Sequence, residues 1–239
     1  MGSIAENIRL VRERIARAAE RAGRRPEDIL LVGASKMNDA AACREAVAAG
    51  IDALGENRVQ EMTEKLAQHA YDGAPLHFIG HLQRNKVRQV VGNVSLIHSA
   101  GSLELLEEID RQAKKRGLVQ DVLLEVNIGR EASKSGFDPD ALFDAAARAR
   151  EFEAVRVLGL MAIPPAAEEP HGNFRYFEKV CRLSVDIAEN LYDNGFEYLS
   201  MGMSDDFEDA IAAGANMVRV GSAIFGHRPY QTTTGGFTQ

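Results

Sequence analysis

The feature that most constrains the fold is an alternation of short apolar runs with longer amphipathic segments, repeated along all 239 residues. The first run, Ile-Leu-Leu-Val-Gly-Ala-Ser-Lys at residues 29–36, is typical of a parallel strand buried on both faces. Seven more strands are predicted at residues 52–57, 76–81, 94–99, 121–128, 156–163, 197–202 and 217–221. This pattern indicates repeated βα units around one parallel sheet.

Helices are predicted between these strands, at residues 39–49, 57–70, 83–91, 102–116, 139–150, 171–193 and 205–213. A further amphipathic helix precedes the first strand at residues 3–22, because Ile4, Ile8, Val11 and Ile15 recur at spacings of three and four. Several predicted helices are followed by glycine, the residue best suited to a left-handed C-terminal cap: Gly50, Gly117, Gly195 and Gly214.

Eight strands that alternate with helices predict an α/β protein, a single (β/α)8 TIM barrel with an extra N-terminal helix. No Gly-x-Gly-x-x-Gly opens a helix, which argues against a dinucleotide-binding doubly wound sheet. The length suits one large core. We expect the barrel to occupy residues 1–230, and residues 231–239, which lack apolar periodicity, to form a flexible C-terminal tail.

Charge and cysteine usage narrow the class of partner. Lys and Arg total 28 against 35 Asp and Glu, a net charge of −7, which argues against nucleic-acid and anionic-membrane surfaces. Cys43 and Cys181 show no Cys-x-x-Cys spacing, so a disulfide framework is not expected. Because no apolar run reaches the length of a membrane span and no signal-peptide core is present, we expect a cytoplasmic protein.

The carboxyl ends of barrel strands surround the active-site mouth, and the first three predicted strands end in Lys36, Asn57 and His81. Lys36 follows an apolar run and is expected to lie partly desolvated, which favours the neutral amine that forms a Schiff base with a carbonyl. The alternative is a solvated lysine at a strand end, and position alone does not decide between the two.

The seventh and eighth strands end in small, hydroxyl-rich and glycine-bearing segments, SMGMSDD at residues 200–206 and RVGSAIFG at 219–226. Barrels commonly bind phosphate in these two loops, which predicts a phosphate site at Ser200, Ser204, Gly221 and Ser222. Alternatively, Ser204 or Asp205 caps the next helix. A phosphate site opposite a lysine suits either a class I aldolase acting on a sugar phosphate or the cofactor pyridoxal 5′-phosphate (PLP).

Two further features are weighed against simpler explanations. His77 and His81 share a strand face, but no third ligand stands at a recognisable offset, so a metal site is not predicted. Lys134 falls in the loop after the fifth predicted strand, where it is either an accessory anion contact or a solvated lysine, and the second is favoured.

Seven segments carry a shared pattern over nearly the whole chain: SKM at 35–37, GENRVQE at 55–61, HFIGHLQRNK at 77–86, NIGREASKSG at 127–136, GLMAI at 159–163, SMGMSDD at 200–206 and VRVGSAIFG at 218–226. Together they resemble the pyridoxal phosphate homeostasis protein family of the YggS/PROSC type. That family is similar in fold to the N-terminal barrel domain of alanine racemase.

The resemblance implies that PLP is held as a Schiff base on Lys36, that Arg219 faces the pyridine nitrogen, and that Asn57 and Met161 line the ring. It also implies a set of phosphate contacts from the two loops: Ser200, Met203, Ser204, Gly221 and Ser222. An arginine can only donate, so the ring nitrogen stays unprotonated and the cofactor is a weakened electron sink.

The resemblance implies PLP (vitamin B6) homeostasis with no dedicated catalytic activity, PLP-dependent apoenzymes as possible partners, and a monomer. Racemisation needs acid/base groups on both faces of the substrate carbon, and the fold relatives take a tyrosine from a partner subunit's second domain. None of the five tyrosines is an evident substitute: Tyr71, Tyr176, Tyr192, Tyr198 and Tyr230. A weak single-domain racemase remains the main alternative, and a class I aldolase a third.

Overall fold

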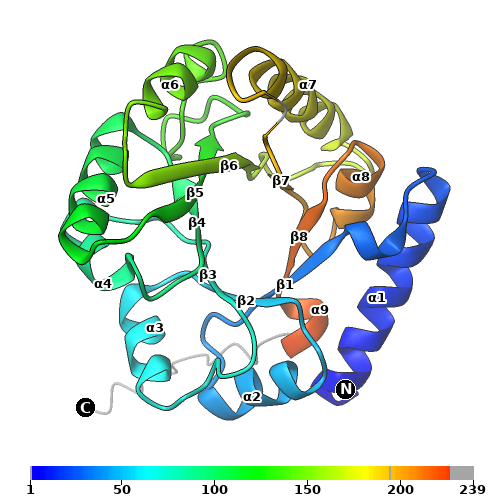
Figure 1. Cartoon of the computed structure of the whole chain (residues 1–239). Coiled ribbons are helices and arrows are strands. Elements are labelled where there is room, and N and C mark those ends of the chain that lie inside the picture. The colour runs from blue at the N-terminus through cyan, green and yellow to red at the C-terminus, as the bar shows by residue number, and fades with distance from the viewer. Residues whose placement is uncertain (1, 194, 227–239) are drawn as a thin grey trace, which may run out of the picture.

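The structure is a computed structural model that describes residues 2–193 and 195–226. Eight parallel strands follow one another around a closed barrel, β1 to β8 in chain order, and β8 pairs with β1 (Figure 1). The strands are β1 (Leu30–Ala34), β2 (Ala53–Glu56), β3 (Leu76–Phe78), β4 (Leu96–Ala100), β5 (Gln120–Val126), β6 (Val155–Ala162), β7 (Tyr198–Ser200) and β8 (Met217–Val220). The predicted (β/α)8 barrel is therefore confirmed.

Helices surround the barrel on the outside (Figure 1). They are α1 (Ile4–Arg21), α2 (Ala40–Ala48), α3 (Val59–Leu66), α4 (Val87–Val90), α5 (Leu103–Arg116), α6 (Leu142–Ala149), α7 (Phe174–Leu191), α8 (Phe207–Ala212) and α9 (Ser222–Phe225), with short 3-10 helices η1 (Pro26–Asp28) and η2 (Arg84–Lys86). The helix predicted at residues 83–91 is split between η2 and α4, and α9 was not predicted.

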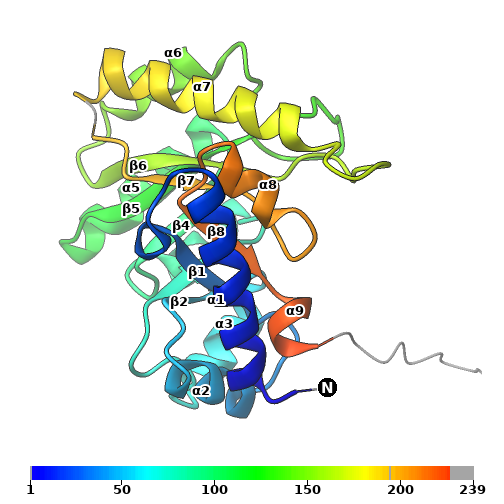
Figure 2. The ribbon, with the colours of Figure 1, turned by 90° about the vertical axis from the view of Figure 1, so that its right-hand side faces the viewer.

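The extra N-terminal helix covers the side of the barrel where the chain closes on itself. Ser3 caps α1 by accepting a hydrogen bond from the Glu6 amide at 3.2 Å, and the apolar stripe of Ile8, Val11 and Ile15 is buried. Helix α1 packs against α2, α8 and α9, beside the paired strands β1 and β8 (Figures 1 and 2). The first helix therefore covers the contact between the first and last strands.

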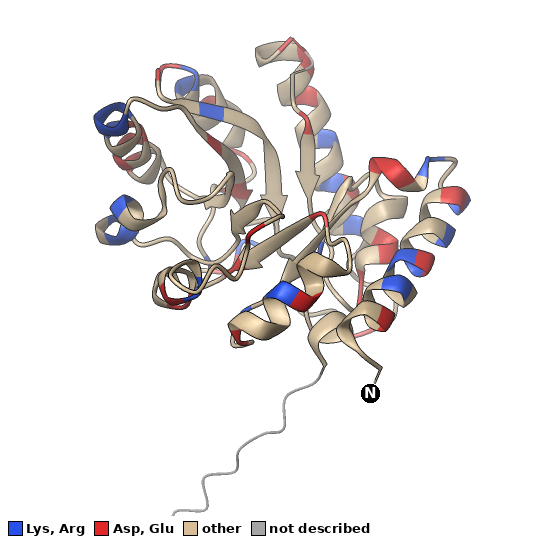
Figure 3. Ribbon diagram, turned by 60° about the horizontal axis from the view of Figure 1, so that its bottom comes forward, with Lys and Arg blue, Asp and Glu red and all other residues tan. Residues whose placement is uncertain are grey.

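The buried residues form two apolar clusters separated by the sheet. The larger lies between the strands and the helices, and the smaller fills the barrel with Val32, Leu123, Met161, Met217 and their neighbours. Each fully buried aliphatic side chain contributes roughly 1.5–3 kcal/mol. Charged residues gather on the outer helices, and the strands are largely free of them (Figure 3). The outer helices are therefore charged, whereas the strands of the barrel are largely uncharged.

No helix within the described residues combines the length and apolar character needed to cross a membrane. Cys43 and Cys181 are free thiols, the first buried and the second half-buried. The predicted tail at residues 231–239 and Tyr230 lie outside the described residues, so the domain boundary stays a prediction.

Candidate functional site

Alternate residues of each strand point into the barrel, and this alternation brings the predicted site residues to its carboxyl-terminal end. Leu30, Val32 and Ala34 belong to the interior cluster, so the same face continues to Lys36. Counting by two from interior residues on the other strands leads to a set of positions at the same end: Asn57, His81, Glu125, Arg219 and Gly221. On β6, Met161 itself belongs to the interior cluster. The predicted site residues at these positions therefore surround one mouth of the barrel.

Lys36 lies at the rim of this mouth and not inside it. Strand β1 ends at Ala34, two residues earlier, and Lys36 occupies a turn in which its side chain is exposed. Met37, the next residue, adopts a left-handed backbone with φ of 61°. The partial desolvation expected for Lys36 is therefore not found, because the strand ends too early to bury it. The amine remains accessible from solvent.

A buried polar cluster lies directly behind Lys36. Glu56 is fully buried at the end of β2, and its Oε1 accepts from Ser35 Oγ at 2.6 Å, Lys65 Nζ at 2.6 Å and Tyr71 OH at 3.0 Å. Lys65 reaches this carboxylate from α3 and is itself 6% exposed. Burial and the neighbouring carboxylate raise the pKa of Tyr71, so its phenol stays protonated and donates. None of these contacts was predicted from the sequence.

Arg219 lies on β8, at the level of Val32 on β1, and is 4% exposed. Its guanidinium donates to Ser200 Oγ at 2.5 Å and to the Ala162 carbonyl at 3.0 Å. Burial lowers the pKa of Arg219 to about 10, which leaves the group cationic at neutral pH. Within the described residues no carboxylate forms an ion pair with it. A buried cation thus forms the floor of the mouth.

Ser200 belongs to this floor. It is fully buried, and its hydroxyl meets both Arg219 and His98 Nδ1, the latter at 3.0 Å. The hydroxyl is therefore engaged inside the barrel and not in the loops after β7 and β8, where the sequence predicts it. His98 Nε2 continues the chain to His77 Nδ1 at 3.0 Å. Desolvation lowers the pKa of His77 to about 4 and that of His98 well below its usual value, so both rings are neutral.

The loops after β7 and β8, for which the sequence predicts a phosphate site, contact each other. Ser204 Oγ accepts from the Gly221 amide at 3.3 Å, which joins the two loops, and Ser222 begins α9. Met203 is exposed, and its amide donates to Asp206 Oδ1 at 2.7 Å. Helix α8 begins after Asp206, with no side-chain cap, so the alternative that Ser204 or Asp205 caps it is wrong. Met203 contributes its side chain, not a free amide, to the rim.

Asn57 and Met161 approach the mouth from opposite sides, Asn57 directly after β2 and Met161 on β6. Asn57 Oδ1 is buried without a hydrogen-bond partner, and Met161 is fully buried in the interior cluster. At Gly80, after β3, an added Cβ would lie 2.2 Å from the Asn57 carbonyl oxygen, so only glycine permits this approach. This packing could not be predicted from local spacing, because Asn57 and Gly80 follow two different strands.

A carboxyl group that the sequence analysis did not single out faces the mouth from β5. Glu125 is half-buried, and its Oε2 has no hydrogen-bond partner. Desolvation raises the pKa of Glu125, and the nearby His81 and Arg219 charges oppose that shift. His81 is linked to Ser135 Oγ at 3.1 Å. A lone glutamate in the apolar run DVLLEVNI was the available signal.

The remaining candidates have local roles. Lys134 is half-buried, pairs with Glu131 and donates to the Pro164 carbonyl at 3.2 Å, so it is not a freely solvated side chain.

The described residues contain no cluster of three or more His, Cys, Asp or Glu side chains that could hold a metal ion.

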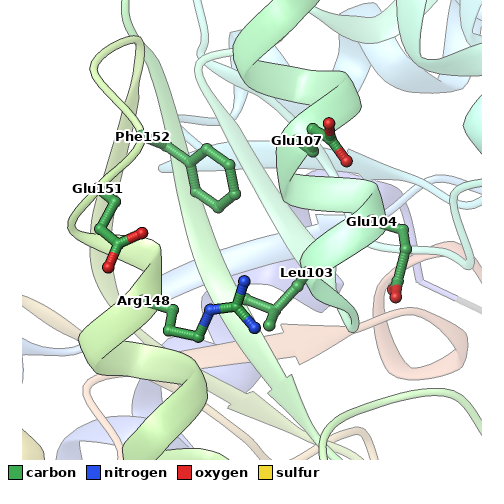
Figure 4. A pocket seen from close by; sticks show the side chains of 6 residues that line it. All are labelled: Leu103, Glu104, Glu107, Arg148, Glu151 and Phe152. Carbon is green, nitrogen blue, oxygen red and sulfur yellow. The ribbon is translucent and has the colours of Figure 1, made fainter.

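Two surface cavities lie outside the mouth. One, of about 330 Å³, lies between α5 and α6 and is lined by Leu103, Glu104, Glu107, Arg148, Glu151 and Phe152 (Figure 4). The other, of about 340 Å³, lies against α3 and the turn after Lys36. The first is lined by none of the predicted site residues, so the site is identified by its chemistry and not by cavity size.

This arrangement presents an accessible amine at the rim, a buried cation at the floor and two glycine- and serine-bearing loops between them. An amine can attach to a carbonyl compound, and the loops can donate to an anion. The geometry therefore suits a phosphorylated carbonyl ligand.

Comparison with known proteins places the chain beside named relatives. The sequence pattern of the family described as alanine racemase, N-terminal domain, matches residues 2–229. The pyridoxal phosphate homeostasis protein of Aquifex aeolicus is 44% identical over 225 residues, which are 94% of this chain and 98% of the relative.

Two solved structures are also similar over most of the chain. A Bifidobacterium adolescentis protein described as unknown has a TM-score of 0.85 and 37% identity, with 93% of this chain and 94% of that chain covered. PipY of Synechococcus elongatus, solved with PLP bound, has a TM-score of 0.79 and 31% identity, with 94% of this chain and 100% of that chain covered.

Proposed function

The chain belongs to the pyridoxal phosphate homeostasis protein family, whose barrel is that of the alanine racemase N-terminal domain, and we propose that it binds PLP as a Schiff base on Lys36 in vitamin B6 homeostasis. The observation that carries the proposal is that one barrel mouth holds both an accessible Lys36 and a buried Arg219, whose side chain can only donate hydrogen bonds. The PLP named in the description of the PipY structure supports it.

The residues present fit this cofactor. PLP offers an aldehyde, a pyridine nitrogen and a phosphate, and the site offers an amine, a guanidinium that can only donate, and two loops with backbone and hydroxyl donors. Asn57 Oδ1, buried without a partner, supplies a polar position that the protein itself does not satisfy. When bound, the cofactor would supply a carbonyl carbon to which amines add reversibly.

Each residue then has a defined task. Lys36 holds the cofactor, Arg219 contacts the ring nitrogen and keeps a proton off it, and Asn57 and Met161 line the ring. Ser204, Gly221 and Ser222 hold the phosphate, with Met203 at the rim. Ser200 acts mainly through Arg219, because its hydroxyl already accepts from that guanidinium. The exposed rim leaves the cofactor open to amines from solution, which suits storage and transfer.

We propose that the protein has no dedicated catalytic reaction. The relative from Aquifex aeolicus is named for homeostasis and not for a reaction. Tyr71 donates to Glu56, Tyr192 donates to the Ala146 carbonyl at 2.9 Å, and Tyr198 begins β7 at the opposite end of the barrel. These tyrosines are therefore poor candidates for the second acid/base group that a racemase needs. Weak racemase activity remains the alternative, tested by loss of optical activity from an L-amino acid.

We further propose that the protein works in the cytoplasm as a monomer and hands PLP to PLP-dependent apoenzymes. Two free thiols, one of them buried, accord with a reducing compartment. Size-exclusion chromatography with light scattering tests the monomer, and transfer of PLP to a purified apoenzyme, followed by recovery of that enzyme's activity, tests the partner class.

The central test is an absorbance spectrum after incubation with PLP, followed by borohydride trapping and mass analysis of the labelled peptide. Wild type is expected to gain a near-visible band and a label on Lys36, and the Lys36→Ala variant neither. Lys115→Ala, an exposed lysine on α5, is the matched control and should behave as wild type. A label scattered over surface lysines in wild type would overturn the proposal in favour of another phosphorylated ligand.

A further inference from the structure

We infer that helix α3 positions Lys36, with Glu61 and Lys65 holding the two peptide groups on either side of it. Glu61 and Lys65 are one helical turn apart and therefore project from the same face of α3. The inference rests on the proposed function, in which Lys36 carries the cofactor. Neither α3 residue needs to touch the cofactor, so both are positioning residues.

The contacts are direct. Lys65 Nζ donates to the carbonyl oxygen of Ser35 at 2.9 Å, and Ser35 immediately precedes Lys36. On the other side, the amide of Met37 donates to Glu61 Oε2 at 2.7 Å. Lys36 lies beyond the end of β1, where the sheet no longer fixes the backbone. Two side chains of one helix therefore take over that task at the residue where the position of the amine matters most.

The Lys65 ammonium is itself fixed. It shares Glu56 Oε1 with the hydroxyls of Ser35 and Tyr71, and all four side chains are buried. A buried ion pair adds little net stability, because desolvation of both charges offsets their attraction. Its value here is a single defined position for the Lys65 amine, and hence for the Ser35 carbonyl. The pair links the end of β2 to α3 and to the residue before Lys36.

Glu61 holds the backbone of Met37, the residue of the turn with an unfavourable conformation. Met37 has φ of 61°, a left-handed conformation that a residue with a Cβ adopts only when its surroundings hold it. The hydrogen bond from its amide to Glu61 is such a restraint. The Glu61 side chain is 20% exposed and also lies 3.5 Å from Arg58 NH1, so it can be changed without opening the core. Glu61 is therefore the better residue to vary.

Restraint of the Lys36 backbone should favour attachment of the aldehyde, because it limits the volume that the amine samples. It should not affect binding of the ring or the phosphate, which other residues contact. Pyridoxine 5′-phosphate separates the two effects, since it lacks the aldehyde and cannot form a bond with lysine. A purely structural defect would weaken both ligands, whereas loss of positioning would weaken PLP alone.

The experiment compares wild type with Glu61→Ala, Glu61→Gln and Glu64→Ala. Glu64 is exposed on the same helix and serves as the control. Glu61→Ala is expected to weaken PLP binding by about tenfold, the effect of one lost hydrogen bond, and to leave pyridoxine 5′-phosphate affinity within about twofold. Glu61→Gln keeps an acceptor oxygen and should restore most of the affinity. In ligand-free protein, hydrogen exchange of the Met37 amide should quicken in Glu61→Ala but not in Glu64→Ala.

Unchanged PLP affinity in Glu61→Ala, or an equal loss for both ligands, would overturn the positioning role while leaving the proposed function intact. Failure of wild type to label at Lys36 would overturn the proposed function, and the positioning role with it.

Discussion

The guanidinium of Arg219 donates a 2.5 Å hydrogen bond to the hydroxyl of Ser200, and both side chains are buried at the floor of the barrel mouth. The same hydroxyl meets His98 at 3.0 Å. One serine therefore serves a cation on β8 and an imidazole on β4. The polar groups at the barrel floor depend on each other for their hydrogen bonds.

Ser200→Ala should lower the free energy of unfolding by about 1–2 kcal/mol, because it leaves a buried guanidinium and a buried ring nitrogen each short of a partner. Urea denaturation followed by circular dichroism measures this. Ser204→Ala, at a half-exposed position in the following loop, is the control and should cost less. Equal costs for the two variants would contradict the role assigned to Ser200.

His77 predicts a loss of stability in acid. Its pKa falls from 6.5 to about 4 on burial, so the unfolded chain binds a proton between these values and the folded protein does not. Stability should therefore fall as pH is lowered from 6.5 towards 4, by at most about 3 kcal/mol from this group. His77→Gln, which cannot titrate, should show a shallower slope in urea denaturation. Parallel slopes for the two proteins would refute the prediction.

Glu125 predicts the opposite dependence on pH. Its pKa is raised by desolvation, so the folded protein favours the protonated carboxyl and stability declines as pH rises above the ordinary value of 4.5. Glu125→Gln should accordingly have a higher Tm than wild type at pH 7.5, and the difference should shrink near pH 4.5. A variant less stable than wild type at pH 7.5 would mean that ionised Glu125 has a stabilising partner.

Replacement of Gly159 and of Gly50 by alanine separates the cost of a steric clash from the cost of backbone strain. A Cβ at Gly159 would lie 1.8 Å from the Tyr198 carbonyl oxygen, whereas a Cβ at Gly50 meets nothing within 4 Å. Gly159→Ala should therefore disrupt the pairing of β6 with β7 and cost roughly 3 kcal/mol or more. Gly50→Ala, with φ of 77°, should cost only about 1 kcal/mol from backbone strain. Thermal unfolding of both variants measures the contrast.

The barrel was predictable because its strands are continuous apolar runs and its helices are amphipathic. The split of residues 83–91 into η2 and α4, and the short helix α9, were missed because segments of three or four residues carry too little periodicity. The early end of β1 was missed because the run of small and apolar residues does not mark where the strand ends. The Ser35 amide still donates to the Gly55 carbonyl at 3.0 Å, but the assigned strand ends at Ala34, and Lys36 lies in the following turn with its side chain exposed.

The site was predictable in part. The positions of Lys36 and of the two glycine-bearing loops followed from strand ends, whereas the parts given to Arg219, Asn57 and Met161 came from resemblance to a family. The cluster around Glu56 was not predictable, because its members lie just after β1, on β2, on α3 and in the turn beyond α3, and no local spacing relates them. Glu125 was visible as a charge in an apolar strand, but its surroundings were not.

The closure of the barrel between β1 and β8 has a consequence for biosynthesis. Lys36 is made early and Arg219 late, so a chain still on the ribosome carries the reactive amine without the residues that complete its pocket. The mouth exists only once the last strand has joined the first. On the proposed function, capture of PLP would therefore report that synthesis has passed β8, and half-made chains would not sequester the vitamin.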